Sequence, residues 1–450
     1  MVARGFKQLE GIDYFETYSP TASIDIIRIL VGIAVSRKWL IHQMDIRNAY
    51  LYGDIDTDIY IKQPEGFINS RYPNQVYKLN KSLYGPKQSS KNWFLTIKDF
   101  LLLLDFKQSV YEQCLFYRND NEYLMIYVDD IIILTNNMNN IIKIKGELQS
   151  KFKISDLGEL NYYLGIKFKI SENSIKLNQS KFINDALKKF RLNNAYHINT
   201  PLDLNLKLDN TDNSGKLIED MKLYQSMIGT LNYISLGTRP DITFPVNLCA
   251  RFSKSPRSAH MNSVIRIFKY LKGTINQELC YKYNNDKFEV KSYSDADYAG
   301  DLVERKSISG SVIEINNTPF IWNSRRQKTI ALSTAEAEYL SITDCVKKTI
   351  FIRNLLNEIK IYNLKEENII YCDNQAAAKI ANSNINNSRT KHIDIRYHFI
   401  KELINNKVIK IEYCNTRLMK ADLLTKSIPY PQLKNLLRLI NCEVNNEGEC

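Results

Sequence analysis

The sequence predicts a mixed α+β chain with more than one domain, and three observations lead to this prediction. A length of 450 residues with 44% hydrophobic side chains exceeds what one ordinary core accommodates. Apolar runs with helical spacing alternate with short β-branched runs, so both helices and strands are expected. From about residue 286 onward, strands and helices follow one another in the order of a separate α/β module.

The first half of the chain is expected to contain two amphipathic helices and a strand pair. Apolar residues recur at helical spacing in residues 24–40 and 91–104. The run 41–46 (IHQMDI) is typical of a strand. Residues 123–134 are apolar and β-branched on both sides of a central Asp pair, which predicts a β-hairpin, and residues 161–170 are again strand-rich.

The second half divides into a helical part and the α/β module. The polar, Asn-, Asp- and Lys-rich stretch 203–220 is the best linker candidate, and residues 222–275 are mostly helical. The module then predicts, in order, strands 289–295 and 309–315, helix 334–359, strand 368–373, helices 374–381 and 397–404, and strand 408–414. The expected domains are therefore residues 1–200, 201–285 and 286–450.

Charge and cysteine usage narrow the class of protein. Lys and Arg number 61 against 49 Asp and Glu, and the net charge of +12 favours a polyanionic partner such as nucleic acid, although a merely basic surface gives the same balance. The 8 cysteines form no Cys-x-x-Cys pair, so neither a zinc site nor a disulfide framework is expected. Without a signal peptide or a membrane-spanning apolar run, we expect an intracellular protein, not secreted and not membrane-bound.

Three aspartates in the first half have the pattern of a metal site. Asp45 ends the strand 41–46, and Asp129 with Asp130 occupies the turn of the hairpin. Like charges at a partly desolvated turn are costly, and a divalent cation offsets that cost. Two such ions about 4 Å apart can activate a hydroxyl and stabilise a leaving pyrophosphate. An ordinary solvated Asp-Asp turn is the alternative, but Tyr127 before it and the apolar strand after it favour the metal site.

Ordered motifs along the chain resemble the reverse transcriptases of copia-type retrotransposons. They are GIDYFETYSP (11–20), HQMDIRNAYLYGDI (42–55), QPEGF (63–67), KSLYGPKQS (81–89), YVDD (127–130), DLGELNYYLGI (156–166) and TRPDI (238–242). The resemblance covers almost the whole chain. It implies a right-hand polymerase with palm and partial fingers in residues 1–200 and a helical thumb or connection in 201–285, followed by an RNase H-like domain in 286–450. The opening residues are similar to the middle of the fingers, so we expect an earlier part of that domain to be missing.

The resemblance implies roles for residues around the first acids. Asp45 and Asp129 are expected to hold Mg²⁺, with Mn²⁺ as a possible substitute, and Asp130 is their neighbour. Tyr50 lies where an aromatic ring is expected under the incoming sugar, so that it would exclude a 2′-hydroxyl. Core packing is the alternative for Tyr50.

Two further motifs are expected to meet substrate. By the same resemblance, Tyr84, Gly85 and Lys87 line the nucleotide and template pocket. The family usually has Leu where this chain has Pro86, and Pro removes an N–H and fixes φ, which is tolerable if residue 86 opens the next helix. The positions where the family holds the primer end are Leu164 and Gly165.

Four acidic residues of the C-terminal module form a second ordered set. Asp295 ends a strand, Glu338 lies in a helix, Asp373 ends another strand, and Asp422 opens the short helix 421–426. Each alone could be a helix cap or a dipole partner, most of all Asp422. As a set they resemble the RNase H site, which implies two Mg²⁺ ions and a bound water that attacks an RNA phosphodiester.

Some assignments in this module have competitors. Glu336 competes with Glu338, but the small Ser341 lies three positions after Glu338, where the RNase H pattern has a small residue facing the sheet. Asp297 competes with Asp295, which ends the strand more naturally. The stretch before Asp422 lacks the loop His of many RNase H enzymes, and His392 is expected to be positional or substrate-contacting.

The leading hypothesis is an RNA-directed DNA polymerase with RNase H activity, which acts on an RNA template, a DNA primer, dNTPs and an RNA–DNA hybrid. We expect such an enzyme to be located in a cytoplasmic virus-like particle, in the nucleus, or in both. The alternatives are a truncated relic that only binds nucleic acid, and an RNase H with a vestigial polymerase. The sequence leaves the oligomeric state open.

Overall fold

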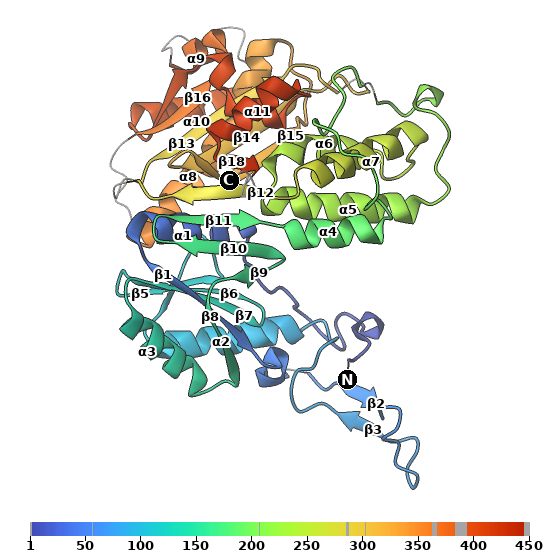
Figure 1. Ribbon diagram of the computed structural model, residues 1–450. Coiled ribbons are helices and arrows are strands. Elements are labelled where there is room, and N and C mark those ends of the chain that lie inside the picture. Colours follow the sequence, from blue (N-terminus) through green and yellow to red (C-terminus); the bar gives the residue numbers. More distant parts are fainter. Residues whose placement is uncertain are drawn as a thin grey trace, which may run out of the picture. The chain divides into compact units, whose positions relative to one another are not determined.

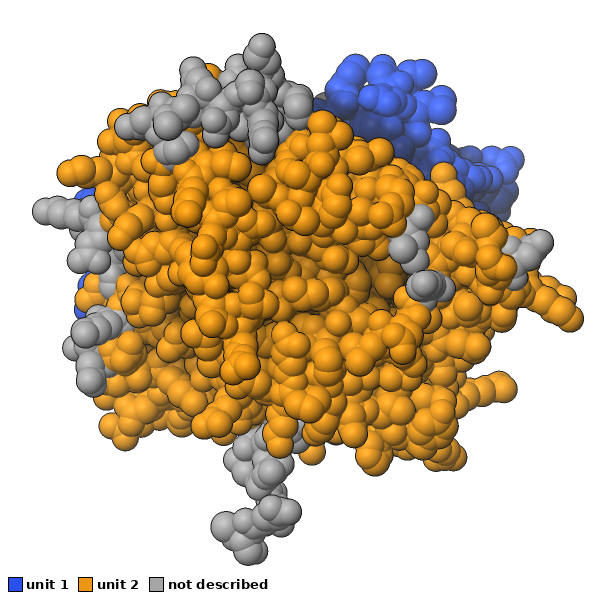
Figure 2. Space-filling model, turned by 90° about the horizontal axis from the view of Figure 1, so that it is seen from above, with its two compact units in different colours: residues 1–26, 39–160, 355–361 blue, residues 27–38, 161–354, 362–450 orange. Residues whose placement is uncertain are grey.

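The computed structural model describes residues 2–55, 57–206, 208–284, 288–301, 303–361, 367–382 and 394–444, in two compact units. Unit 1 comprises residues 1–26, 39–160 and 355–361, and unit 2 comprises residues 27–38, 161–354 and 362–450 (Figure 2). Unit 1 therefore includes the short segment 355–361 from the second half of the chain, and unit 2 includes the short segment 27–38 from the first half.

Unit 1 is built on a six-stranded antiparallel sheet with the order β4-β5-β6-β7-β1-β8 (Figure 1). Its strands are β1 (Leu40–Ile46), β4 (Lys107–Gln108), β5 (Leu115–Arg118), β6 (Glu122–Tyr127), β7 (Asp130–Thr135) and β8 (Ile154–Glu159). The other elements of unit 1 are helices α2 (Ser89–Leu103) and α3 (Met138–Gln149) and the hairpin of β2 (Tyr60–Lys62) with β3 (Val76–Lys78).

The predicted hairpin is present as β6–β7, and it lies at the centre of this sheet. Residues 123–126 and 131–134 are buried along their whole length, because their apolar side chains are covered on both faces. The turn places the β-branched Val128 at φ +57°, a strained conformation. The indole Nε1 of Trp93 donates to the carbonyl of Val128 at 2.7 Å and so holds the turn in place.

Unit 2 contains two five-stranded sheets. The first has the order β18-β12-β11-β10-β9 and is antiparallel. The second has the order β15-β14-β13-β16-β17, with antiparallel pairs among β13, β14 and β15 and parallel pairs from β13 to β16 and from β16 to β17. The strands are β9 (Tyr162–Tyr163), β10 (Ile166–Ser171), β11 (Ser174–Asn178), β12 (Gln277–Lys282), β13 (Val290–Asp297), β14 (Ile308–Ile315), β15 (Thr318–Arg326), β16 (Asn368–Cys372), β17 (Ile409–Tyr413) and β18 (Cys442–Val444).

Helices of unit 2 form a helical layer and the crossovers of the mixed sheet. Most of α1 (Ile24–Arg37) belongs to this unit, and α4 (Ser180–Lys189), α5 (Met221–Gly237), α6 (Thr243–Ala250) and α7 (Ser258–Gly273) pack together (Figure 1). The mixed sheet is accompanied by α8 (Thr334–Glu358), α9 (Gln375–Asn382), α10 (Asp394–Asn405) and α11 (Tyr430–Leu439). Because α8 connects β15 to β16, β16 can return parallel to β13.

Strands and helices of the C-terminal module occur in the predicted order, with three additions. Strand β15 was not expected; it follows β14 after a two-residue turn in which Asn316 and Asn317 have φ of +49° and +66°. Two consecutive left-handed Asn residues are typical of a tight hairpin turn. Helix α11 and strand β18 are the other two additions.

The polar stretch 203–220, expected as a linker, belongs to unit 2 and is hydrogen-bonded to it, although most of its described residues are exposed or half-buried. The amide of Ile218 donates to the carbonyl of Pro256 at 2.8 Å, and the Arg257 guanidinium donates to the Gly215 carbonyl at 2.8 Å. Neither boundary of the three-domain division coincides with a boundary between the two units, so that division stays a prediction.

Two general expectations concern membranes and thiols. Across the described ranges, no helix has the length and apolar character needed to cross a bilayer. The seven cysteines in these ranges are free thiols.

Candidate active sites

The first acid cluster lies at the end of the β6–β7 hairpin in unit 1. Asp45 on β1 pairs with Asp130 on β7 in the antiparallel register, and the amide of Ile46 donates to the carbonyl of Asp129 at 2.8 Å. Asp45 and Asp130 are therefore neighbours on adjacent strands, with Asp129 in the turn directly before β7. Burial, and next the charges of Asp45 and Asp129, raise the pKa of Asp130 against the lowering effect of a hydrogen bond from Gln43.

Tyr84 contacts this cluster directly. Its hydroxyl donates to Oδ2 of Asp129 at 2.9 Å, and burial together with this hydrogen bond raises the pKa of Tyr84 to about 12. The Tyr50 ring lies edge-on to the Tyr84 ring with centroids 4.5 Å apart, and its hydroxyl lies 3.1 Å from Oγ of Ser90. Tyr50 is half-buried beside the acids, so its ring contributes to packing and also borders the site.

Gly85 and Lys87 have partners within unit 1. Gly85 has φ +119°, and a Cβ at this position would overlap the Ala3 carbonyl, so the close backbone approach is to residue 3. The Lys87 ammonium donates to the Tyr14 hydroxyl at 2.8 Å. Pro86 does not open helix α2, which begins three residues later, but its carbonyl accepts from the Ser89 amide at 3.3 Å.

Leu164 and Gly165 form the turn between β9 and β10 in unit 2. Both have positive φ, +45° and +69°, and the Tyr233 hydroxyl donates to the Leu164 carbonyl at 2.5 Å. A Cβ on Gly165 would lie 3.4 Å from the Tyr233 ring, so the turn packs on helix α5. Their expected role at the primer end stays a prediction.

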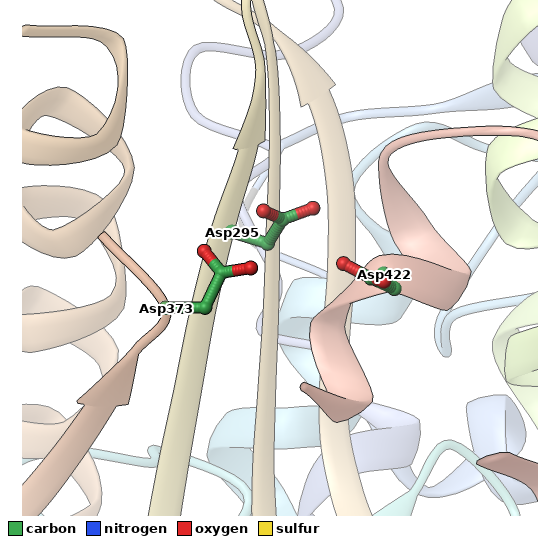
Figure 3. A group of neighbouring side chains, drawn as sticks. All are labelled: Asp295, Asp373 and Asp422. Atoms are coloured by element: carbon green, nitrogen blue, oxygen red, sulfur yellow. The ribbon is translucent and has the colours of Figure 1, made fainter. Parts of the chain in front are cut away.

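The second acid cluster lies on the mixed sheet of unit 2. Asp295 on β13, Asp373 directly after β16 and Asp422 on a 3-10 helix, Lys420–Leu424, each place a carboxylate oxygen within 4.8 Å of the other two (Figure 3). Asp295 precedes the end of its strand by two residues, and Asp422 lies within its short helix instead of opening it. The parallel pairing of β13 with β16 brings the first two acids to one edge.

Glu338 on α8 lies close to two of these aspartates, Asp295 and Asp373. It is only 5% exposed, and burial, then the charges of Asp295 and Asp373, raise its pKa to about 9. Glu336 instead accepts a hydrogen bond from the Leu332 amide at 2.8 Å at the start of the helix. The geometry therefore places Glu338, not Glu336, with the aspartates.

Ser341 anchors this part of α8 to the sheet. Its hydroxyl donates to the carbonyl of Asp295 at 2.7 Å, and Ser294 donates to it at 2.9 Å. A small polar side chain three positions after Glu338 allows the helix to approach β13 closely. Asp297 lies at the end of the same strand, and burial followed by the charge of Asp295 raises its pKa.

Two residues of the cluster were not foreseen from the sequence, Thr425 and Lys426. The Thr425 hydroxyl donates to Oδ2 of Asp295. The Lys426 ammonium lies 2.8 Å from Oδ1 of Asp422 and 3.7 Å from Oδ2 of Asp295. Burial raises the pKa of Asp422 to about 7, with the charge of Asp295 adding to this effect and Lys426 opposing it. The i to i+4 spacing of Asp422 and Lys426 was the available signal.

Further residues fix the positions of these acids. Lys420 and Glu314 form a buried ion pair of 2.6 Å that ties the 3-10 helix of Asp422 to β14. The Thr416 hydroxyl donates to Oδ2 of Asp373 at 2.8 Å. His392 and the nearby Arg389 and Lys391 lie outside the described residues.

The donor set of the second cluster fits a divalent cation. Its four carboxylates carry more negative charge than Lys426 balances, and Oε2 of Glu338 is buried without a hydrogen-bond partner in the part of the chain that the structure describes. Carboxylate oxygens are the ligands that Mg²⁺ and Mn²⁺ prefer. In unit 1, Asp45 and Asp129 offer the same chemistry, with one oxygen of Asp129 occupied by Tyr84.

Comparisons with known proteins agree with these motifs. A family described as "Reverse transcriptase (RNA-dependent DNA polymerase)" matches residues 1–204. The chain is 34% identical over 457 residues to the retrovirus-related Pol polyprotein from transposon TNT 1-94 of Nicotiana tabacum, covering 99% of this chain and 34% of that protein. It is 36% identical over 438 residues to the corresponding polyprotein from transposon RE1 of Arabidopsis thaliana, covering 97% and 30%.

A shorter relative is covered almost completely. The transposon Ty5-1 protein of Saccharomyces cerevisiae is 31% identical over 309 residues, which is 67% of this chain and 99% of that protein. Among solved structures, LC11-RNase H1 isolated from compost is 12% identical and covers 30% of this chain and 92% of its own, but its TM-score of 0.25 is too low to support any argument.

The matches extend over both units, and the chain spans about a third of the length of the two plant polyproteins. Its first 204 residues match the reverse transcriptase family, and its motifs have the copia-type order. The chain belongs to the copia-type retrotransposon Pol polyproteins and includes their reverse transcriptase domain.

Proposed function

We propose that this chain is an RNA-directed DNA polymerase with RNase H activity, and that each activity uses two divalent ions. The observation that carries the proposal is that each unit assembles its own acid cluster from separate elements. Sequence positions far apart converge at each cluster, which a solvated Asp-Asp turn or a set of helix caps would not require.

In the proposed polymerase site, Asp45 and Asp129 hold the metal ions and Asp130 lies beside them. The ions, when bound, would activate the primer hydroxyl and stabilise the leaving pyrophosphate. The Tyr84 hydroxyl orients Asp129 through the bond of 2.9 Å. Tyr84, Gly85 and Lys87 line the nucleotide pocket, Tyr50 excludes the 2′-hydroxyl, and Leu164 with Gly165 supports the primer end.

In the proposed RNase H site, Asp295, Glu338, Asp373 and Asp422 hold the ions. The ions, when bound, would activate a water for attack on an RNA phosphodiester. Ser341 and the Lys420–Glu314 pair fix the backbones from which the acids project. Burial holds the pKa values of Glu338 and Asp422 above their ordinary values, and a bound cation would lower them.

The two activities would act on connected substrates. Copying an RNA template onto a DNA primer yields an RNA–DNA hybrid, which is the substrate of the second site. The hybrid, the template, the primer and dNTPs are therefore the proposed partners. The net charge of +12 suits all of these polyanions.

Separate substitutions in the two clusters test this proposal. With a primed RNA template, dNTPs and Mg²⁺, Asp129→Asn should abolish extension and spare cleavage of a preformed hybrid. Asp373→Asn should abolish cleavage and spare extension. In each case the loss should exceed about a hundredfold, because one ligand of the metal pair is lost.

A matched control separates these effects from charge alone. Asp185→Asn removes an exposed carboxylate on α4 and should leave both activities unchanged. If the wild-type chain binds hybrid but neither extends nor cleaves it, the chain is an inactive relic that only binds nucleic acid. If only cleavage is observed, the polymerase unit is vestigial.

Tyr50 has its own test. We expect Tyr50→Ala to incorporate ribonucleotides more readily than the wild type, because the ring that would clash with a 2′-hydroxyl is gone. Tyr50→Phe is the control: it keeps the ring and loses only the contact with Ser90. Unchanged sugar selectivity in Tyr50→Ala would remove this residue from the gate.

A further inference from the structure

The TRPDI motif builds a buried polar network in unit 2 that neither acid cluster uses. The side chains of Arg239 and Asp241 are 1% and 0% exposed and form an ion pair of 2.7 Å. Asp241 also accepts from the Tyr270 hydroxyl at 2.6 Å, and Arg239 donates to the Thr274 hydroxyl at 2.6 Å. A buried ion pair is costly unless its remaining polar groups are satisfied. A network as complete as this one therefore calls for an explanation.

Two residues of this network line a cavity. The cavity measures about 530 Å³ and is lined by Tyr270 and Thr274 of the network, with Gln277 and Cys442 beside them. Gln277 is 3% exposed, and its Nε2 donates to Sγ of Cys442 at 3.1 Å. Its Oε1 has no hydrogen-bond partner among the residues placed in the structure. A buried, unpaired acceptor in a cavity wall is a group that a ligand donor would satisfy.

The wall of the cavity formed by α11 is basic and aromatic. Lys434 and Arg438 both line it from α11, one helical turn apart and so on one face of the helix. No ion pair to either side chain occurs within the described ranges, and Glu443 is the acidic residue of the lining. Tyr430, which is 46% exposed, adds an aromatic ring to the same wall.

These features together define the chemistry of the ligand. Two adjacent cations suit a phosphate, an exposed tyrosine ring suits a stacked base, and the Gln277 oxygen requires an N–H or O–H donor. A fatty acid would supply the anion but not the donor or the planar ring. The volume lies within the roughly 300–1,000 Å³ of small-molecule sites.

We propose that this cavity binds a nucleotide, with its phosphate between Lys434 and Arg438 and its base toward Tyr430 and Gln277. The nucleotide is either a free mononucleotide or the phosphorylated end of a strand, since both carry the same groups. The proposed nucleotide site contains none of the acids proposed for catalysis, so it can be tested independently of the proposed activities.

Calorimetric titration of the full chain in EDTA tests the proposal. EDTA removes divalent ions, so nucleotide cannot bind through a metal at either acid cluster. We expect AMP to bind at least about tenfold more tightly than adenosine, because only AMP carries the phosphate. The double variant Lys434→Ala/Arg438→Ala should reduce AMP affinity to that of adenosine.

Matched variants complete the experiment. Lys188→Ala/Lys222→Ala removes two exposed lysines of α4 and α5 that do not line the cavity, and it should bind AMP as the wild type does. Gln277→Met should weaken AMP and adenosine alike; if this buried variant fails to fold in a thermal melt, the surface pair alone decides. A 5′-phosphorylated trinucleotide that binds where AMP does not would identify a strand end as the ligand.

Three results would overturn the proposal. They are equal affinity for AMP and adenosine, AMP binding that survives the loss of Lys434 and Arg438, and no binding of AMP or the trinucleotide at all. None of these bears on primer extension or hybrid cleavage, which are measured separately with Mg²⁺.

Discussion

Single residues offset the negative charges of the acid clusters. In the second cluster, the ammonium of Lys426 lies against Asp422 and Asp295 and partly balances their charges. Burial would lower the pKa of Lys426, but these two carboxylates raise it, so the side chain stays cationic. In the first cluster, the neutral hydroxyl of Tyr84 contacts Asp129 instead. The two sites therefore stabilise their acids by different means.

Lys426→Met tests whether this lysine competes with metal ions. Without Mg²⁺, the variant should melt at a lower temperature, because the carboxylates lose their nearest cation. Mg²⁺ should then stabilise it more than the wild type, with an apparent affinity raised by about three- to tenfold. Thermal melts across a Mg²⁺ titration measure both effects. Lys379→Met on α9 is the exposed control, and an unchanged or weaker Mg²⁺ response in Lys426→Met would contradict the prediction.

His260 gives unit 2 a pH dependence. The amide of Arg257 donates to Nδ1 of this buried residue at 2.9 Å, which caps helix α7, and burial lowers its pKa from the usual 6.5. The unfolded chain therefore takes up the proton first as the pH falls. The contribution of His260 is present above about pH 6.5 and is lost below it, because protonated Nδ1 cannot accept the bond.

Urea unfolding at about pH 7.5 and about pH 5.5 measures this contribution. The wild type should lose about 1 kcal/mol more than His260→Ala over this interval, the usual size of a capping hydrogen bond. His197→Ala, which changes an exposed histidine, should behave as the wild type. An equal loss in wild type and His260→Ala would show that the cap does not titrate.

At the scale of elements, helix α1 is an integral part of unit 2. The guanidinium of Arg28, which is 1% exposed, donates to the carbonyls of Gly237 at 2.9 Å and Phe320 at 2.7 Å and lies 3.8 Å from the Trp322 ring centroid. It thereby provides hydrogen-bond donors for carbonyls at the end of helix α5 and near the start of strand β15, both of which are distant from Arg28 in sequence.

Arg28→Met should destabilise unit 2 strongly. The substitution leaves buried carbonyls without their donor, and we expect a loss of about 2–4 kcal/mol in the free energy of unfolding. Arg71→Met, at an exposed position of unit 1, should change it by less than about 0.5 kcal/mol. Chemical denaturation of both variants provides the measurement, and equal stabilities would show that α1 is dispensable.

For the whole molecule, the composition of the units predicts which fragments can fold. The expected C-terminal domain, residues 286–450, omits partners that its strands need. Tyr281 donates to the Pro319 carbonyl at 2.7 Å, and the Trp322 indole donates to the Ser235 carbonyl at 3.0 Å. Strand β18 pairs with β12, which also lies before residue 286.

A fragment of residues 286–450 should therefore lack a cooperative thermal transition. In the fragment, the Pro319 carbonyl and the Trp322 indole would lose their hydrogen-bond partners, and β18 would lose its neighbouring strand β12. Calorimetry of this fragment beside the full chain is the measurement. A sharp transition of the fragment would establish residues 286–450 as an independent domain, as the sequence predicted.

The sequence by itself determined most of the local elements and supplied the acidic residues on which the proposed sites depend. Periodicity predicted α1, α2 and the β6–β7 hairpin, because burial of an apolar face imposes its spacing on the chain. The spacing from Glu338 to Ser341 favoured Glu338 over Glu336, since the helical repeat is a local property, and Ser341 does contact β13. Strand β15 was missed although its Asn316–Asn317 turn was visible.

Only the tertiary structure decided which distant residues share a site. Contacts between remote segments bring Lys426 to the acids, place Tyr84 on Asp129 and make α1 part of unit 2. Such contacts also place residues of the TRPDI network in the lining of a cavity. Such contacts leave no periodic signal in one sequence, because they arise from the packing of whole elements and not from the conformation of neighbouring residues.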